Sequence, residues 1–135
     1  LDLASGELRY ADGGHPAGLL RSVVDGRVTI ERLGTTGALL GAVEDATWDE
    51  RVVTLDPGAT LLLYTDGVTE ARSGTRFFGE GRVRRAVRPG GSATAVAERI
   101  LAAVQRFTGG DIRDDAAILA VRYAADDDVS GADQA

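Results

Sequence analysis

The feature that most constrains this chain is an apolar run that ends abruptly in an acidic turn. Residues 59–64, Ala-Thr-Leu-Leu-Leu-Tyr, are followed by Thr65, Asp66 and Gly67. A short apolar run between turn signals is typical of a strand that is buried on both faces. Asp66 then stands where the strand ends, and a carboxylate there is costly unless a positive partner meets it. An Asp-Gly pair is also the commonest hairpin signal, so this motif alone predicts a plain turn equally well.

A second acidic site lies late in the chain. Asp114 and Asp115 stand directly before another apolar strand candidate, residues 116–123. If the two strands are antiparallel neighbours, Asp66 converges with Asp114 or Asp115 at one edge of the sheet. Carboxylates that lie close together repel each other and need a shared proton or a cation. Oxygen ligands suit Mg²⁺ and Mn²⁺, so the pattern predicts a site for one of these ions.

The first half of the chain reads as a series of antiparallel strands. Before the 59–64 strand, the predicted strands cover residues 1–4, 7–11, 17–22, 27–33 and 48–55. Turn signals at Ser5-Gly6 and Asp25-Gly26 predict that the first four of them form two hairpins. In the 48–55 strand, the alternation predicts core contacts from Trp48, Val52 and Leu55.

Helix signals appear only between the two acidic sites. They predict a short helix over residues 79–88 and a longer one from Ser92 or Thr94 to about Phe107. The longer helix has one apolar face, formed by Val96, Ile100, Ala103, Val104 and Phe107. Strands followed by helices and a final strand favour an α+β fold, with helices on one face of an antiparallel sheet. We expect one domain over residues 1–123 and a disordered acidic tail over residues 124–135.

Composition excludes several classes of function. The chain has 135 residues and no cysteine, which excludes disulfides and thiolate metal sites. His15 is the only histidine, so a zinc site of the usual kind is also excluded. The net charge of −6 disfavours nucleic-acid binding. No stretch approaches the roughly 20 apolar residues of a membrane span, no signal-peptide pattern is present, and we expect a cytoplasmic protein.

Two further features have a functional and a structural interpretation. Arg82, Arg84, Arg85 and Arg88 form a basic cluster on the short predicted helix. This cluster either docks an acidic or phosphorylated partner or is a solvated helix face, which is the interpretation we favour. His15 precedes Pro16 in a tight loop, where we expect it to hydrogen-bond the backbone near the site without a catalytic role.

Four stretches of the sequence carry a resemblance to a known family. They are Leu-Arg-Tyr-Ala-Asp-Gly-Gly-His-Pro at 8–16, Thr-Gly-Ala-Leu-Leu-Gly at 36–41, Leu-Leu-Tyr-Thr-Asp-Gly-Val-Thr-Glu at 62–70, and Asp114-Asp115 before the last strand. In this order they resemble the metal-dependent protein serine/threonine phosphatases, the PPM family, and more narrowly its bacterial SpoIIE/RsbU branch. The resemblance implies an antiparallel β-sandwich flanked by helices, in the layer order α-β-β-α. It also implies a dinuclear Mg²⁺ or Mn²⁺ site with Asp66 as a ligand, Gly67 as a cofactor-binding position, and Asp114 or its neighbour Asp115 as a further ligand.

The resemblance also implies an activity. It is the hydrolysis of phosphoserine or phosphothreonine by a water that two metal ions activate. The implied substrate is a phosphorylated anti-sigma-factor antagonist in a stress or developmental response. The family's N-terminal half carries a Gly-Asp motif whose carboxylate bridges both metals, and this sequence holds no counterpart before Leu1. We therefore expect the C-terminal part of such a domain, N-terminally incomplete.

An alternative function comes from a different class. Without the bridging carboxylate, the chain would be a catalytically incomplete remnant that serves as a protein-binding or regulatory module. In either case the sheet face where the other half belongs would be exposed, which favours a homodimer.

Overall fold

A four-stranded antiparallel sheet forms the centre of the computed structural model, which describes residues 1–34, 36–112 and 114–124. Its strands lie in the order β3-β2-β5-β8 and have the bounds β3 Arg27–Arg32, β2 Leu19–Val24, β5 Thr60–Tyr64 and β8 Ile118–Arg122. Asp25 and Gly26 both have positive φ, 50° and 72°, which is the backbone of a tight hairpin turn and confirms the predicted β2–β3 hairpin. Apart from Ala124, the predicted acidic tail lies outside the described residues.

Strand β5 lies in the middle of this sheet. It pairs antiparallel with β2 on one side and with β8 on the other, and Tyr64 lies opposite Ile118. The two apolar strands that adjoin the acidic residues are therefore antiparallel neighbours, which is the arrangement that the predicted metal site requires. The sequence predicted that β5 is buried on both faces of the sheet. Leu61 and Leu62, which point to opposite faces, are buried as predicted, but the prediction is wrong for Leu63, which is 36% exposed.

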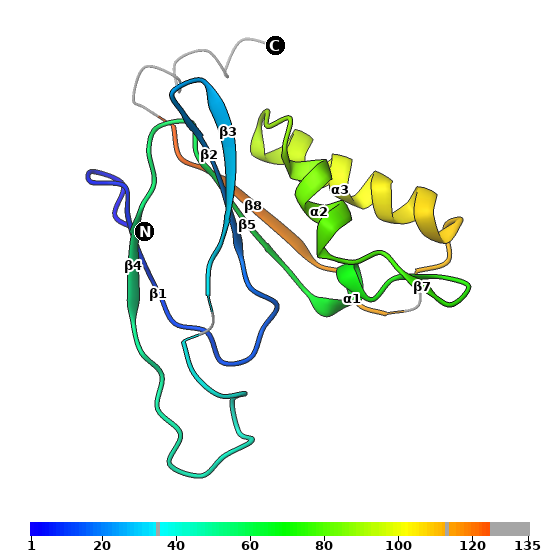
Figure 1. Cartoon of the computed structure of the whole chain (residues 1–135), viewed down its shortest axis with the longest axis horizontal. Helices are drawn as coiled ribbons and strands as arrows, with labels where there is room; N and C mark the ends of the chain where they lie inside the picture. Colours follow the sequence, from blue (N-terminus) through cyan, green and yellow to red (C-terminus); the bar gives the residue numbers. More distant parts are fainter. Residues whose placement is uncertain (35, 113, 125–135) are drawn as a thin grey trace.

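Two helices cover one face of the sheet, as Figure 1 shows. They are α2, Glu80–Val87, and α3, Ala93–Thr108. Ser92 caps α3, because its hydroxyl accepts a hydrogen bond from the Ala95 backbone N–H at 3.1 Å. Gly109 ends the helix in the left-handed conformation, at φ 70°. The apolar faces of both helices pack on the sheet through fully buried side chains, among them Val83, Val87, Val96, Ile100 and Val104.

A two-stranded ribbon lies on the opposite face of the sheet (Figure 1). It consists of β1, Glu7–Tyr10, and β4, Arg51–Thr54, paired antiparallel. It buries Leu8 and Leu55 against the sheet residues Leu20 and Leu61. The layers therefore run helices, sheet, ribbon, which agrees with the α+β fold and with part of a sandwich.

Two predictions for the strands in this part of the chain are wrong. The predicted 1–4 strand does not form, because the Asp2 carboxylate accepts hydrogen bonds from the backbone N–H groups of Ala4 and Ser5 and holds a local turn. Strand β1 pairs instead with β4, and Val52 is 50% exposed. Its neighbour Val53 packs against the core in place of Val52, whereas Leu55 is buried as predicted.

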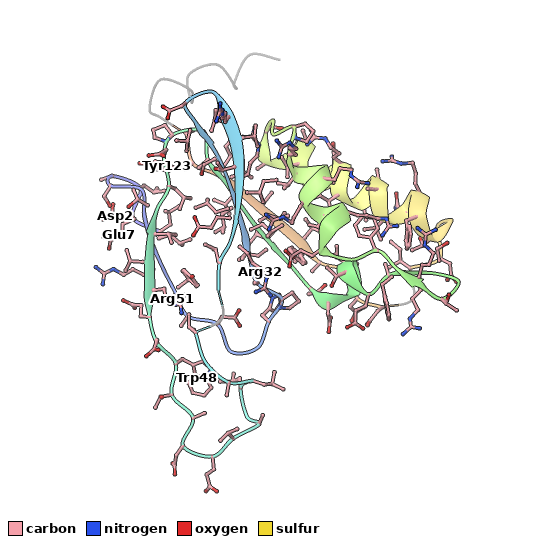
Figure 2. All side chains as sticks on the ribbon, viewed as in Figure 1. Asp2, Glu7, Arg32, Trp48, Arg51 and Tyr123 are labelled. Carbon is pink, nitrogen blue, oxygen red and sulfur yellow. The ribbon has the colours of Figure 1, made fainter. Side chains whose placement is uncertain are left out.

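Several short elements were not predicted from the sequence. They are α1, Asp66–Thr69, and a small hairpin of β6, Arg72–Ser73, with β7, Arg76–Phe77. The long connection between β3 and β4 extends beyond the ribbon, and Figure 2 shows Trp48 within it. The Trp48 indole N–H donates to the Ala38 carbonyl at 2.8 Å, which ties the two sides of this connection together. Within the described part of the chain, no helix combines the length and the apolarity that a membrane crossing requires.

Candidate metal site at the β5–β8 edge

The residue that joins the two acidic segments is Thr65, directly after β5. Its backbone N–H donates to the Ala117 carbonyl at 3.1 Å, which continues the β5–β8 pairing by one residue. Its hydroxyl donates to the Asp115 carbonyl at 2.8 Å and accepts from the Ala117 backbone N–H at 2.9 Å. One side chain therefore holds the segment before β8 against the end of β5. The sequence analysis assigned no role to Thr65, although a threonine between an apolar strand and Asp-Gly is a usable signal.

Gly67 is the point of closest approach between these segments. A Cβ at this position would stand 2.5 Å from the Asp115 carbonyl oxygen, a distance that real Cβ atoms do not show. Gly67 is buried in the first turn of α1, and its backbone packs directly against the backbone of Asp115. Asp66 and Gly67 thus open a helix, and the hairpin interpretation of this pair is wrong.

The three predicted carboxylates lie on these two adjoining segments. Asp66 begins α1, and Asp114 and Asp115 lie just before β8; all three residues are exposed. One Asp114 oxygen accepts the Asp115 backbone N–H at 2.8 Å, which turns that side chain back along its own segment. None of the ion pairs between described residues involves any of the three.

These residues fit part of a metal site. Exposed carboxylate oxygens are the donors that Mg²⁺ and Mn²⁺ prefer. The described residues form no group of three or more potential ligands, however, so Asp66, Asp114 and Asp115 do not by themselves make a complete metal site. Asp66 with Asp114 or Asp115 would hold an ion only if further ligands or water completed the shell.

A cleft of about 580 Å³ borders this edge on its ribbon side. It lies between β1 and the ends of β5 and β8, and its lining is mainly apolar, including Leu8, Leu63 and Leu119. Thr65 and Ala117 line the cleft at its boundary with the acidic edge.

The loop that contains His15 also lines this cleft. The Asp12 carboxylate holds the loop by accepting the backbone N–H groups of Gly14 and His15 at 2.7 and 2.9 Å. The His15 ring nitrogen Nδ1 lies 3.3 Å from the Pro16 carbonyl oxygen, so the side chain contacts its own loop. The structure therefore places His15 beside the cleft, and among the described residues it belongs to no cluster of potential ligands.

Tyr64 separates the acidic edge from the helix-covered core. Burial raises the pKa of its phenol to about 12, with a smaller contribution from the negative charge of Glu80. The hydroxyl therefore stays protonated at neutral pH and adds no charge to the carboxylates beyond it.

Sequence comparison places nearly the whole described chain in one family. The family described as Stage II sporulation protein E (SpoIIE) matches residues 1–124. Protein IcfG of Synechocystis is 39% identical over 85 residues, which are 62% of this chain and 13% of IcfG.

Solved structures with the same fold include several phosphatase domains. The phosphatase domain of SpoIIE from Bacillus subtilis superposes with a TM-score of 0.70 at 16% identity and covers 93% of this chain. A Mycobacterium tuberculosis structure of RsbU and RsbW domains gives a TM-score of 0.72 at 25% identity over 93% of this chain. The SiaA-PP2C domain of Pseudomonas aeruginosa gives 0.68 at 25% identity over 87%.

The chain spans only part of each of these proteins. It covers 56% of the B. subtilis domain, 35% of the M. tuberculosis chain and 47% of the P. aeruginosa domain. The family match over residues 1–124, together with the shared fold of the solved structures, identifies the relationship. The chain belongs to the SpoIIE family and corresponds to part of a PPM-type phosphatase domain of the SpoIIE/RsbU branch.

Proposed function

We propose that this chain is the C-terminal part of a metal-dependent phosphoprotein phosphatase domain, and that the β5–β8 edge carries its share of the metal ligands. The observation that supports this most directly is the double contact of Thr65 and Gly67 with Asp115. These contacts bring Asp66 beside the segment of Asp114 and Asp115, although 50 positions separate Thr65 from Asp115 in the sequence. A plain surface turn needs no such arrangement.

Each residue at the edge has a separate task in this proposal. Thr65 fixes the register of the two segments, and Gly67 allows their backbones to touch. Asp66 and Asp114, or Asp115 in place of Asp114, present carboxylate oxygens to Mn²⁺ or Mg²⁺. When bound, such an ion supplies the positive charge that promotes attack of water on a phosphate ester.

The substrate that we propose is a phosphoserine or phosphothreonine on a regulatory protein, of the anti-sigma-factor-antagonist type. Membership of the SpoIIE/RsbU branch supports this class of substrate. The proposal includes a cytoplasmic location and regulation of a sigma factor in a stress or developmental response. Homodimerisation through the ribbon side of the sheet is a further part of it, because Leu63 and Leu119 are exposed there.

An activity assay tests the proposal. Since the described residues do not form a group of three ligands, we expect the 135-residue chain to hydrolyse p-nitrophenyl phosphate near background with saturating Mn²⁺. Joining to it an N-terminal segment that carries the family's Gly-Asp motif should produce activity, and Asp66→Ala in that longer polypeptide should abolish it. Strong turnover by the short chain that depends on Asp66 would show that the ligand set is larger than we propose.

The second candidate is a non-catalytic protein-binding module, and the incomplete ligand set favours it. It predicts that the longer polypeptide also remains inactive on phosphoprotein substrates. In that case the contacts of Thr65 and Gly67 would serve the stability of the edge alone.

A further inference from the structure

A second hollow lies on the outer side of the helix layer, on elements that the candidate metal site does not use. It has a volume of about 420 Å³ and lies between α2 and α3. Eight described residues line it, and four of these are arginines: Arg82 and Arg85 from α2, and Arg99 and Arg106 from α3. We call it the arginine groove; the other residues that line it are Phe78, Ala86, Ala103 and Phe107.

Two of the four guanidinium groups are held in place by the protein. Arg82 donates from Nη1 to the carbonyls of Phe77 and Phe78, and its guanidinium carbon lies 4.5 Å from the centre of the Phe107 ring. Arg99 donates to the carbonyls of Ala86 and Gly90 at 3.2 and 2.9 Å. Each guanidinium has five N–H donors, so these bonds orient the groups and leave three donors on each for a ligand.

The other two arginines have no such bonds. Arg85 and Arg106 are exposed, and no ion pair or side-chain hydrogen bond within the described residues involves either guanidinium. Among the residues that the structure describes, no acidic side chain lines the groove. A concentration of positive charge without local compensation stands out in a chain whose net charge is −6.

The groove differs from the basic cluster that the sequence suggested. Of that cluster, Arg84 lies apart, because it donates to the Ile30 carbonyl at 2.6 Å and to the Glu80 carboxylate at 3.4 Å. Arg88 does not line the groove. Arg82 and Arg85 are joined instead by Arg99 and Arg106, which belong to the next helix, so a solvated face of one helix is not an adequate description.

We infer that the arginine groove is a docking site for an acidic segment of a partner protein. Guanidinium groups bind carboxylates in bidentate geometry, and the two oriented groups lose little side-chain entropy when they do so. Phe78 and Phe107, packed edge to face at 5.5 Å, provide an apolar floor for the side chains between the acidic residues. Nucleic acid is a poorer fit, because the net negative charge of the chain opposes a polyphosphate.

A binding assay without metal tests this inference independently of any phosphatase activity. The probe is a fluorescein-labelled oligo-glutamate peptide, followed by fluorescence anisotropy with the 135-residue chain in low-salt buffer. The double variant Arg85→Gln/Arg106→Gln removes the two exposed charges without touching the bonds of Arg82 and Arg99. We expect it to weaken binding roughly fivefold or more, since each exposed charge pair contributes modestly. Salt should weaken binding by the wild-type chain.

The matched control is Arg27→Gln/Arg51→Gln, which removes two exposed arginines from β3 and β4, strands that contribute no described residue to the groove. We expect this variant to bind the peptide as the wild type does. Equal loss in both variants would show a general charge effect and overturn the site, as would absence of peptide binding by the wild type. Competition by oligo-dT that is as strong as competition by unlabelled oligo-glutamate would overturn the assignment of the partner as protein.

Discussion

The two faces of the central sheet are covered very differently. On the helix side, the core side chains of β2, β5, α2 and α3 are almost fully buried. On the ribbon side, a smaller cluster around Leu8, Leu55 and Leu61 borders a cleft of about 580 Å³. Leu63 and Leu119 are 36% and 56% exposed there. The helix side is therefore the more completely packed face of the sheet, whereas the ribbon side carries an open cleft next to the acidic edge.

The largest expected effect comes from a cavity in the helix-side core. Ile100→Ala should reduce the free energy of unfolding by about 2–5 kcal/mol, because Ile100 is fully buried among well-packed neighbours. Leu8→Ala on the ribbon side should cost clearly less, since Leu8 already borders the cleft. Urea denaturation of both variants measures the difference. Equal costs would mean that the two faces are packed equally well and would break the comparison.

A smaller effect is expected where the acidic edge meets the core. Gly67→Ala places a methyl group against the Asp115 carbonyl and should destabilise the chain by about 1–3 kcal/mol. The matched control is Gly81→Ala, because a Cβ there meets nothing within 4 Å and α2 should gain up to about 1 kcal/mol. Thermal melts distinguish the two. If Gly67→Ala were as well tolerated as the control, the close contact of the two segments would be absent in solution.

The smallest effect is a pH dependence that involves Tyr64. Burial raises the pKa of Tyr64 from its ordinary 10 to about 12 in the folded chain, so folding favours the protonated phenol. Its contribution to stability is therefore complete below pH 10 and is lost as the pH rises to 12. Urea midpoints measured across this range should fall in the wild type and fall less in Tyr64→Phe. Identical slopes would show that Tyr64 is not shielded from water on the helix side.

Much of the architecture follows from local patterns in the sequence. The Asp25-Gly26 hairpin occurs as predicted, and Ser92, one of the two caps that the sequence allowed, begins the longer helix, because each feature depends on residues close together in the chain. The pairing of β1 with β4 could not be predicted in this way. It joins strands about 45 residues apart, and the local Asp2 turn competes with the hairpin that the pattern favours.

The candidate site was predictable only in outline. The order of the strands brings Asp66 near Asp114 and Asp115, and the sequence indicates this once β5 and β8 are taken as neighbours. The means by which the segments are held was not visible, because the hydroxyl of Thr65 and the missing side chain of Gly67 act across about 50 residues. The arginine groove could not be predicted for the same reason. It combines arginines from two helices, and the sequence pattern singled out only those of α2.

Calorimetric titration of the chain with Mn²⁺ shows whether the β5–β8 edge binds a metal ion. We expect weak binding by the wild type, which Asp66→Asn and Asp114→Asn each reduce, because two carboxylates and water form only a partial shell. Asp56→Asn serves as the control, since Asp56 is an exposed carboxylate that precedes the opposite end of β5. It should leave Mn²⁺ affinity unchanged. If Asp66→Asn and Asp114→Asn bind Mn²⁺ as tightly as the wild type and the Asp56→Asn control do, the β5–β8 edge is not a metal site.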